Sequence, residues 1–456
     1  MKSFATMELK GIKTNGENVQ GNGRIFSKIT FLLFIGFSST LLSQVRQTDT
    51  LKLSRQHYEE LFLKQNLLLL AETYKINQAE AMVLQAKLWP NPNLTIEEVN
   101  LWATDKQLSY LDEPLPQVFG NVAQNTQFAV QLEQQIVTAR KRKKLMDVEK
   151  VGVKVAEQEF EELLRNLKYE FRNTLTELQY LQLYNRVFLE QRNLIQNLLN
   201  AYKRQLENDH ISKGEYMRLQ TLQLEVSKEI NELSKARNEA EKELKVLLSI
   251  TGPASLFVLE DDFTPNLQNL QNLDMLNLEQ DSLRYRPDVK LAELENEYFK
   301  SLLTYEKSQA IPDLNLNASY DRGGGVWPSF FGFGLSIDLP VFNRNQGAIA
   351  HAQMGIENTT YLSNDLRLRA RAEFDQNYKD FRAALTFYES IDPDFETDLD
   401  EIFESYTKNF VNRNISLLQY LDFQGAYLEN KRIILEAKKE IHLQLERLQY
   451  TVGTEI

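Results

Sequence analysis

The sequence contains no cysteine and only 4 histidines among its 456 residues. The absence of cysteine excludes disulfides, thiolate metal sites and lipid attachment at an N-terminal cysteine. The glycine run at 323–325 lies between two predicted strands, not at the strand-to-helix turn that binds phosphate. No nucleophile stands beside a base, so we expect no enzyme, no metal site and no cofactor. The histidines lie far apart and lack the spacing of metal ligands; they are His57, His210, His351 and His442.

Long hydrophobic runs are almost absent as well. The exception is residues 29–42, an apolar segment that follows basic residues and ends in small ones. It is too short to span a bilayer comfortably, so we interpret 1–43 as an N-terminal extension and signal peptide, cleaved near Ser43. The alternatives are an N-terminal membrane anchor and, because the leading segment is long, translation from Met7 or later. No other segment approaches ~20 consecutive apolar residues, so we expect an exported protein without a transmembrane helix.

Positive charge is also in deficit. The formal net charge is −12, so nucleic-acid binding is not expected. Hydrophobic residues make up 42% of the chain and charged residues 25%, which is typical of a folded protein and too polar for a helical membrane protein. The length suits either two or three domains or one elongated architecture.

Proline and glycine are missing from long stretches of the chain. No proline lies between Pro116 and Pro253, and apolar residues recur there at alternating steps of three and four, which is typical of a coiled-coil seam. We expect one helix from about 140 to 208, which would be roughly 100 Å long. A second should run from about 345 to 412, kinked or interrupted by Pro393.

Four short segments alternate between apolar and polar residues, as strands with one apolar face do. We expect strands near 94–102, 127–137, 313–321 and 329–341. The last is the clearest, because its apolar residues alternate with glycine and polar residues. The row suited to lipid is Phe331, Phe333, Leu335 and Ile337.

The two halves of the chain repeat one another. The segment YKRQLENDHIS (202–212) aligns with YTKNFVNRNIS (406–416), and two further pairs of segments align in the same order. We therefore expect an internal duplication of helix, strand, strand, long helix, turn and helix. Repeat 1 would occupy 44–249 and repeat 2 would occupy 276–456, with a Pro- and Gly-containing linker at 250–275.

The alternating strands raise the question of what covers their apolar face. A small soluble sheet packed on helices is one answer, but it does not explain an export signal together with such long helices. The other answer is lipid. A sheet in lipid must close, because an open edge leaves backbone groups unpaired. Closed barrels begin at about eight strands, so a chain with four would have to oligomerise.

Three motifs carry a resemblance to a known family: DLPVFNRNQG (338–347), NRNISLLQYLDFQGAYLENK (412–431) and IDPDF (391–395). With the duplication, they resemble TolC-type outer-membrane efflux proteins over nearly all of the mature chain. The nearest match is the CzcC-like branch of heavy-metal efflux, in its Bacteroidetes-like version. The resemblance implies a mainly α protomer with a small membrane β part. Three protomers would form a twelve-stranded β-barrel in the outer membrane of a Gram-negative bacterium and a periplasmic α-barrel of coiled-coil helices.

The same resemblance implies a passive exit duct with two kinds of protein partner. A periplasmic adaptor (membrane fusion) protein and an inner-membrane resistance-nodulation-division pump would complete a tripartite system that exports heavy-metal cations. A multidrug or type I secretion duct of the same fold is the alternative. A soluble periplasmic coiled-coil adaptor is a further alternative, although its β-domains should present polar exteriors.

The resemblance places two helix-to-helix turns at the periplasmic tip, where an adaptor docks. Neither turn contains glycine, but Asn and His tolerate a left-handed backbone, so tight turns are expected. The serines suit helix N-caps, which explains them as well as adaptor contact does. The predicted contact residues are His210, Ile211, Ser212, Asn414, Ile415 and Ser416.

Two charged residues follow these turns at equivalent positions, Arg218 in repeat 1 and Asp422 in repeat 2. A threefold axis would repeat each of them around a narrowing pore. Such rings select ions and can lock a gate by pairing between helices. The alternative is a solvated helix face.

Overall fold

A computed structural model describes residues 50–100, 106, 109, 127–259, 263–265, 270, 275–322 and 329–456. The chain divides into two compact units, Met1–Gln47 and Thr48–Ile456, and everything described below belongs to the second. The predicted signal segment and the glycine run at 323–325 lie outside the described residues.

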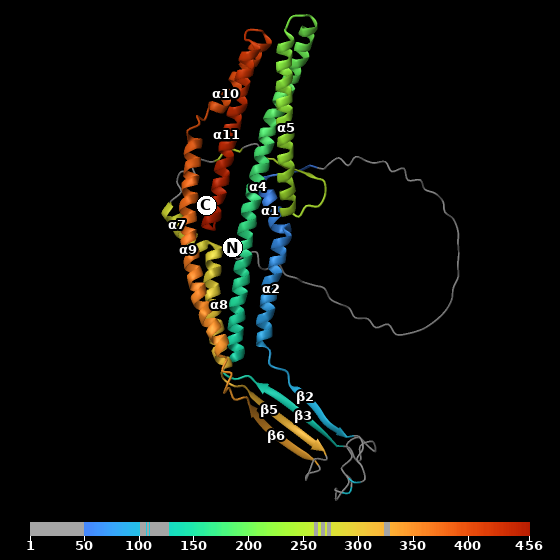
Figure 1. Ribbon diagram of the computed structural model, residues 1–456, viewed down its shortest axis with the longest axis vertical. Coiled ribbons are helices and arrows are strands. Elements are labelled where there is room, and N and C mark those ends of the chain that lie inside the picture. Colours follow the sequence, from blue (N-terminus) through green and yellow to red (C-terminus); the bar gives the residue numbers. More distant parts are fainter. Residues whose placement is uncertain are drawn as a thin grey trace, which may run out of the picture. The chain divides into compact units, whose positions relative to one another are not determined.

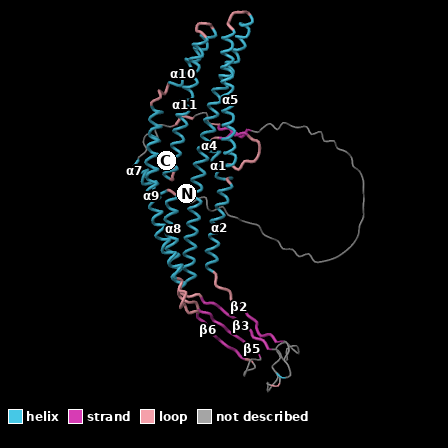
Figure 2. Tube along the Cα trace, viewed as in Figure 1, coloured by secondary structure: helices cyan, strands magenta, loops and turns pink. Residues whose placement is uncertain are grey.

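Helices dominate this unit, and a four-stranded sheet lies beyond the ends of several of them (Figures 1 and 2). The mainly helical fold class with a four-stranded sheet is confirmed. The helices are α1 (Arg55–Gln65), α2 (Leu67–Lys87), α4 (Lys141–Glu207), α5 (Lys213–Leu247), α7 (Met275–Tyr285), α8 (Pro287–Gln309), α9 (Gln346–Glu389), α10 (Phe395–Val411) and α11 (Leu417–Val452).

The predicted long helix is present as α4, which has 67 residues and is therefore about 100 Å long. It packs along α2, α5, α8 and α11. Its three-and-four spacing brings one stripe of side chains into the main core, including the fully buried Phe171 and Leu178. A second core joins α9 to α11 through residues such as Phe381 and Ile441.

The second long helix is interrupted at the predicted proline. α9 ends at Glu389 and α10 begins at Phe395, with Pro393 between them. Proline has no backbone N–H and clashes with the preceding turn, so the helix cannot continue through it. The equivalent stretch of α4 contains no proline and runs without a break.

The sheet contains β2 (Asn93–Asn100), β3 (Gln127–Ile136), β5 (Leu314–Arg322) and β6 (Phe330–Ile337) in the spatial order β2-β3-β5-β6. Each neighbouring pair is antiparallel. β6 ends at Ile337, earlier than the expected position 341, and Pro340 follows, which cannot donate to a ladder.

The predicted linker contains an element that the sequence did not indicate. Its residues Ser255–Val258 form β4, which pairs in parallel with β1 (Thr50–Leu53). The hydroxyl of Tyr58, fully buried, donates to the carbonyl of Leu51 at 2.7 Å and so fixes this small sheet to α1.

Equivalent positions of the two halves have the same backbone conformation. Arg140, before α4, has φ 56°, and Asn345, before α9, has φ 58°. In the turns, Asp209 has φ 55° and Arg413 has φ 61°. These correspondences support the duplication, although its exact boundaries stay a prediction.

Among the helices that the structure describes, none is both long and apolar enough to cross a membrane.

Candidate functional site: an amphipathic sheet and two helical tips

The strand register sorts the side chains of all four strands onto two faces. Residues that are directly opposite in a ladder share a face. One row runs Leu94, Leu132, Ala318, Phe333, and the next runs Ile96, Val130, Tyr320, Phe331. Gln134 and Arg322 are the polar members of this face. Its apolar members are Leu94, Ile96, Phe128, Val130, Leu132, Ile136, Leu314, Leu316, Ala318, Tyr320, Phe331, Phe333, Leu335 and Ile337.

This apolar face is open in the single chain. Phe331 is 71% exposed, Phe333 89% and Leu335 59%, and none of the helices that the structure describes lies over the sheet (Figure 1). Contiguous exposed apolar surface of this kind marks a contact with lipid or protein. The row predicted to suit lipid thus lies together on the uncovered face.

The opposite face is polar. Thr95, Gln131 and Ser319 lie in one row that ends at Gly332. Gly334 follows two residues later, opposite Asn317, and a Cβ at that position would clash with the Asn317 side chain. The glycines of β6 therefore leave room for the polar side chains of β5, which lie across the sheet surface.

The sheet has two open edges. β2 and β6 are its outermost strands, and neither has a partner on its outer side in the part of the chain that the structure describes. An open edge offers unpaired N–H and C=O groups to another strand. The sheet of one chain therefore has two strand edges without partners and an apolar face without a cover.

The two helix turns lie together at the end of the unit away from the sheet (Figure 1). Both returning helices begin with a capping box. The Ser212 hydroxyl accepts from the backbone N–H of Glu215 at 3.2 Å, and Ser416 accepts from that of Gln419 at 3.3 Å. The expected N-caps are thus confirmed. Of the six predicted contact residues, His210, Ser212, Asn414 and Ser416 are exposed, whereas Ile211 and Ile415 are half-buried.

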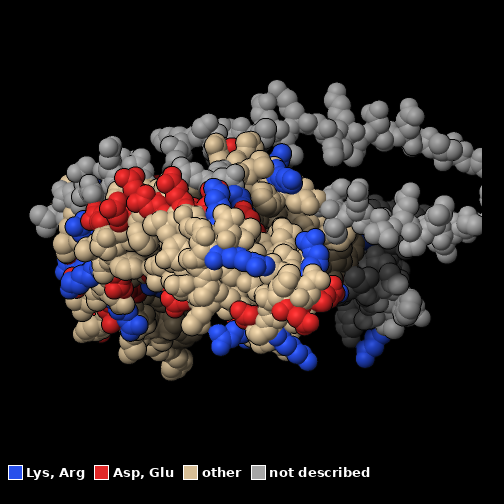
Figure 3. Space-filling view, turned by 90° about the horizontal axis from the view of Figure 1, so that it is seen from above, with Lys and Arg blue, Asp and Glu red and all other residues tan. Residues whose placement is uncertain are grey.

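The left-handed residues of the turns are not the ones considered from the sequence. Asp209 and Arg413 have positive φ, whereas His210 and Asn414 do not. The left-handed residue is thus one position earlier than His210 or Asn414. In the second turn the backbone N–H of Asn414 donates to the backbone carbonyl of Asn409 at 2.8 Å. Viewed from this end (Figure 3), acidic and basic side chains are interspersed among other residues.

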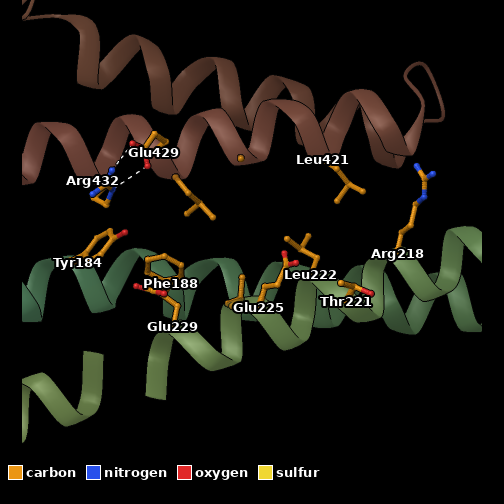
Figure 4. Close-up of a pocket in the computed structure, with 13 residues that line it drawn as sticks. Tyr184, Phe188, Arg218, Thr221, Leu222, Glu225, Glu229, Leu421, Glu429 and Arg432 are labelled. Carbon is orange, nitrogen blue, oxygen red and sulfur yellow. Dashed lines mark hydrogen bonds and ion pairs between the residues drawn. The ribbon is translucent and has the colours of Figure 1, made fainter. Parts of the chain in front are cut away.

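A groove of about 690 Å³ separates the two helical hairpins below the tips. It is lined by α4, α5 and α11, and Arg218 lies at one end of it (Figure 4). Within the groove, Arg432 pairs with Glu429 at 2.5 Å. Asp422 is exposed on α11 and does not line the groove. Among the described residues of one chain, Arg218 and Asp422 form no ion pair, so their predicted pairing is not made within a protomer.

The structure contains a half-buried charge network that the sequence does not predict. Arg172 of α4 pairs with Glu59 of α1 at 2.7 Å and with Glu446 of α11 at 3.3 Å, and Lys168 pairs with Glu59 at 3.1 Å. Burial raises the pKa of Glu446. Burial also acts to raise the pKa of Glu59, but the hydrogen bond and charge of Arg172, with Lys168, outweigh it and lower that pKa. The network ties the two halves together, and no spacing in the sequence signals it.

The described residues contain no group of three or more His, Asp or Glu side chains that could hold a metal ion.

Comparison with solved structures identifies the fold. The chain is similar to the CmeC outer membrane channel of Campylobacter jejuni, with TM-score 0.67, 14% identity, and 87% of this chain and 85% of that chain covered. It is also similar to CusC, with TM-score 0.66, 15% identity, and 88% of this chain and 92% of that chain covered. For the outer membrane protein VceC of Vibrio cholerae the TM-score is 0.64 and the identity 14%, with 88% of this chain and 96% of that chain covered. No protein-family model and no curated protein sequence matches the chain.

At this identity the likeness establishes the fold, which is that of TolC-type outer-membrane channel proteins. These structural neighbours are channels rather than enzymes, which is consistent with the expected non-catalytic role.

Proposed function

We propose that this chain is one protomer of a trimeric outer-membrane channel, which serves as the passive exit duct of a tripartite efflux system. The single observation that carries the proposal is the sheet: four strands with a largely apolar and partly exposed face, a polar opposite face and two open edges. Lipid against the apolar face and water against the polar face would give each face a suitable environment.

The strand count and direction fit closure by three copies. Adjacent strands are antiparallel and there are four, so β6 of one protomer would meet β2 of the next in antiparallel orientation. Three protomers contribute twelve strands, which lies within the range of closed membrane barrels. No edge would then remain in hydrocarbon.

The helices would extend the duct into the periplasm. α4 alone supplies about 100 Å of length, and the paired tips would meet a periplasmic adaptor through His210, Ser212, Asn414 and Ser416. An inner-membrane resistance-nodulation-division pump would deliver the substrate. The structural neighbours that are outer-membrane channels support the location.

Heavy-metal cations are the proposed cargo, on the resemblance of residues 338–347 and 412–431 to the CzcC-like branch. A duct needs no tight metal site, because tight binding would slow transit. A deletion strain should be sensitive to metal salts. Sensitivity to drugs alone, or loss of a secreted protein, would assign the duct to a different cargo.

The sheet face provides the decisive test. Leu335→Asp places a charge on the apolar face. An aspartate there costs less than the ~2–4 kcal/mol of a lysine or arginine at the bilayer midplane, but it should still strongly reduce the trimer recovered from outer-membrane fractions. Ser336→Asp changes the neighbouring residue on the polar face and is the matched control. Equal recovery of the two variants would contradict the assignment of faces. Recovery of the unaltered protein as a soluble monomer, without detergent, would instead favour the adaptor function.

A further inference from the structure

The apolar face of the sheet ends in two exposed aromatic side chains on the side of the helices. Trp89, between α2 and β2, is 58% exposed, and Phe342, between β6 and α9, is 93% exposed. Leu88 and Val341 beside them are exposed as well. Both aromatic residues lie where chain segments pass between helix and strand, so they mark one level of the structure (Figure 1).

Basic side chains gather at the same level. The helices α2, α4 and α9 end or begin there, and these helix ends, with the segments just before α4 and α9, carry six basic residues that are exposed or half-buried. We call these and the two aromatic residues the collar. Its basic members are Lys87, Arg140, Arg142, Lys143, Lys144 and Arg344. This local excess of positive charge stands out in a chain whose net charge is −12.

The central basic residue is held in place. The Arg142 guanidinium lies 3.9 Å from the centre of the Trp89 ring, and its Nε donates to the carbonyl of Leu88 at 3.1 Å. A second nitrogen donates to the carbonyl of Lys87. The aromatic and basic parts of the collar are therefore one surface with a fixed geometry.

Among the residues that the structure describes, ion pairs do not neutralise the positive charge of the collar. Within the described part of the chain, none of the six basic residues forms an ion pair. The nearby carboxylates are engaged elsewhere: Asp313 pairs with Lys141 at 2.8 Å and Asp147 with Lys150 at 3.5 Å. Glu306 accepts from the amide of Asn345. Asp338, which follows β6, is exposed, and one carboxylate does not offset six basic side chains.

We infer that the collar binds anionic phospholipid headgroups in the leaflet on the helical side of the membrane. This inference rests on the proposed membrane location of the sheet. Aromatic side chains favour the level of the headgroups, and Lys and Arg just beyond them attract anionic lipids. Because the charge is continuous with the apolar face, a lipid satisfies both parts at once: its phosphate meets the basic residues while its chains cover the sheet.

Trp89 can report on the lipid that surrounds it. The chain's other tryptophans, Trp102 and Trp327, are replaced by phenylalanine, and the full-length protein is reconstituted in equimolar phosphatidylcholine and phosphatidylglycerol. One lipid or the other carries brominated acyl chains, which quench indole fluorescence on contact. We expect brominated phosphatidylglycerol to quench Trp89 at least about twofold more than brominated phosphatidylcholine, with the ratio falling toward one at high salt.

Two variants separate the collar from net charge. The collar variant replaces Arg140, Lys143, Lys144 and Arg344 with glutamine and should bring the quenching ratio close to one. The control replaces four exposed basic residues near the tips with glutamine, an equal change of charge, and should keep the ratio. Its positions are Lys203, Arg204, Lys213 and Lys228.

The outcomes distinguish this inference from the proposed function. Equal quenching by the two lipids in the unaltered collar, or a ratio that both variants lower alike, overturns the inference while leaving the channel intact. Vesicles that float without the protein overturn the membrane location and the inference together. The comparison of lipids in the unaltered collar decides the matter even if the collar variant does not fold.

Discussion

At the scale of single residues, the two tip turns carry a strain that the sequence did not place. Asp209 and Arg413 have φ of 55° and 61°, in the left-handed region. An L-residue pays roughly 1–2 kcal/mol there, and only glycine avoids the cost. Arginine lacks the short polar side chain that helps Asp or Asn to adopt this conformation, so Arg413 is the more strained of the two.

Arg413→Gly should therefore stabilise the second tip by about 0.5–1 kcal/mol. The backbone N–H of Asn414 donates to the backbone carbonyl of Asn409 at 2.8 Å, and its hydrogen exchange should slow by about two- to fivefold. Asn414→Gly is the control, since that residue does not have positive φ and glycine should only loosen it. Faster exchange in Arg413→Gly would show that the turn is not strained.

Part of the structure of these turns is predictable from the sequence. The positions of the turns and the N-caps Ser212 and Ser416 are predictable, because a short polar residue before an amphipathic helix is a local signal. The left-handed residue is not predictable, since its position depends on how the last helical turn closes. Adaptor contact by the six tip residues stays a prediction.

At the scale of elements, α10 is cut off from α9, and ion pairs to α11 hold its first turns in addition to the buried aromatic contacts between the two helices. Lys431 pairs with Asp400 at 2.7 Å and with Glu396 at 3.2 Å, and Lys438 pairs with Glu396 at 2.8 Å. Lys431 is almost fully buried. The start of α10 is thus attached to the neighbouring helix rather than continued from the one before it.

Glu396→Gln should loosen α10. Burial acts to raise the pKa of Glu396, but Lys438 and Lys431 outweigh it and lower that pKa. Its stabilising effect is therefore complete above the unfolded pKa of about 4.3 and is lost as pH falls through the lower folded value. At pH 7 we expect α10 amides to exchange about fivefold faster than in the unaltered protein, as for the loss of about 1 kcal/mol.

The exchange difference should shrink as the pH falls below about 4.3. Glu404→Gln is the matched control on the same helix: Glu404 pairs with Lys408 at 2.6 Å, but both side chains are exposed, so its removal should have little effect. A difference for Glu396→Gln that is independent of pH would mean that the ion pairs do not hold α10.

Other elements show which features a sequence pattern predicts and which it does not. Pro393 predicted the break in the second long helix because its effect is local. The pairing of β1 with β4 joins two four-residue strands about 200 residues apart, and neither is long enough to show a period. The contacts of Arg172 likewise join α1, α4 and α11. Only the folded chain brings such groups together.

At the scale of the whole molecule, threefold symmetry would give Asp422 and Arg218 a role that they lack in one chain. Three copies of Asp422 around a narrow lumen would create a negative potential that attracts cations. Asp422→Ala should then lower cation preference or raise basal conductance in planar bilayers, and Arg218→Ala should raise basal conductance. Glu404→Ala, on the neighbouring helix, is the control. Unchanged conductance and selectivity in both variants would remove the gate and leave the duct.

Closure of the barrel between protomers can be tested by cysteine cross-linking. The chain contains no cysteine, so only the introduced residues can form a disulfide. If β6 of one protomer pairs with β2 of the next, cysteines introduced at Thr95 and at one of Gly332, Gly334 or Ser336 should come within disulfide distance, with Cα atoms about 4.4–6.8 Å apart. At the two glycines the side chain of Ser319 or Asn317 has to turn aside to admit the new Cβ. All four positions belong to the polar face, so a shared register lets them meet across the seam.

Oxidation of membranes that carry the matching pair should produce covalent dimers and a covalent trimer on denaturing gels, and a reductant should reverse them. Each single cysteine should remain monomeric. The control pairs Thr95→Cys with Asn317→Cys: β3 separates β2 from β5 within one chain, and β6 separates β5 from the neighbour's β2, so no disulfide should form. Cross-linking in this control, or its absence in all three β6 pairings, would mean that the sheet does not close edge to edge, and its open strands would need another partner.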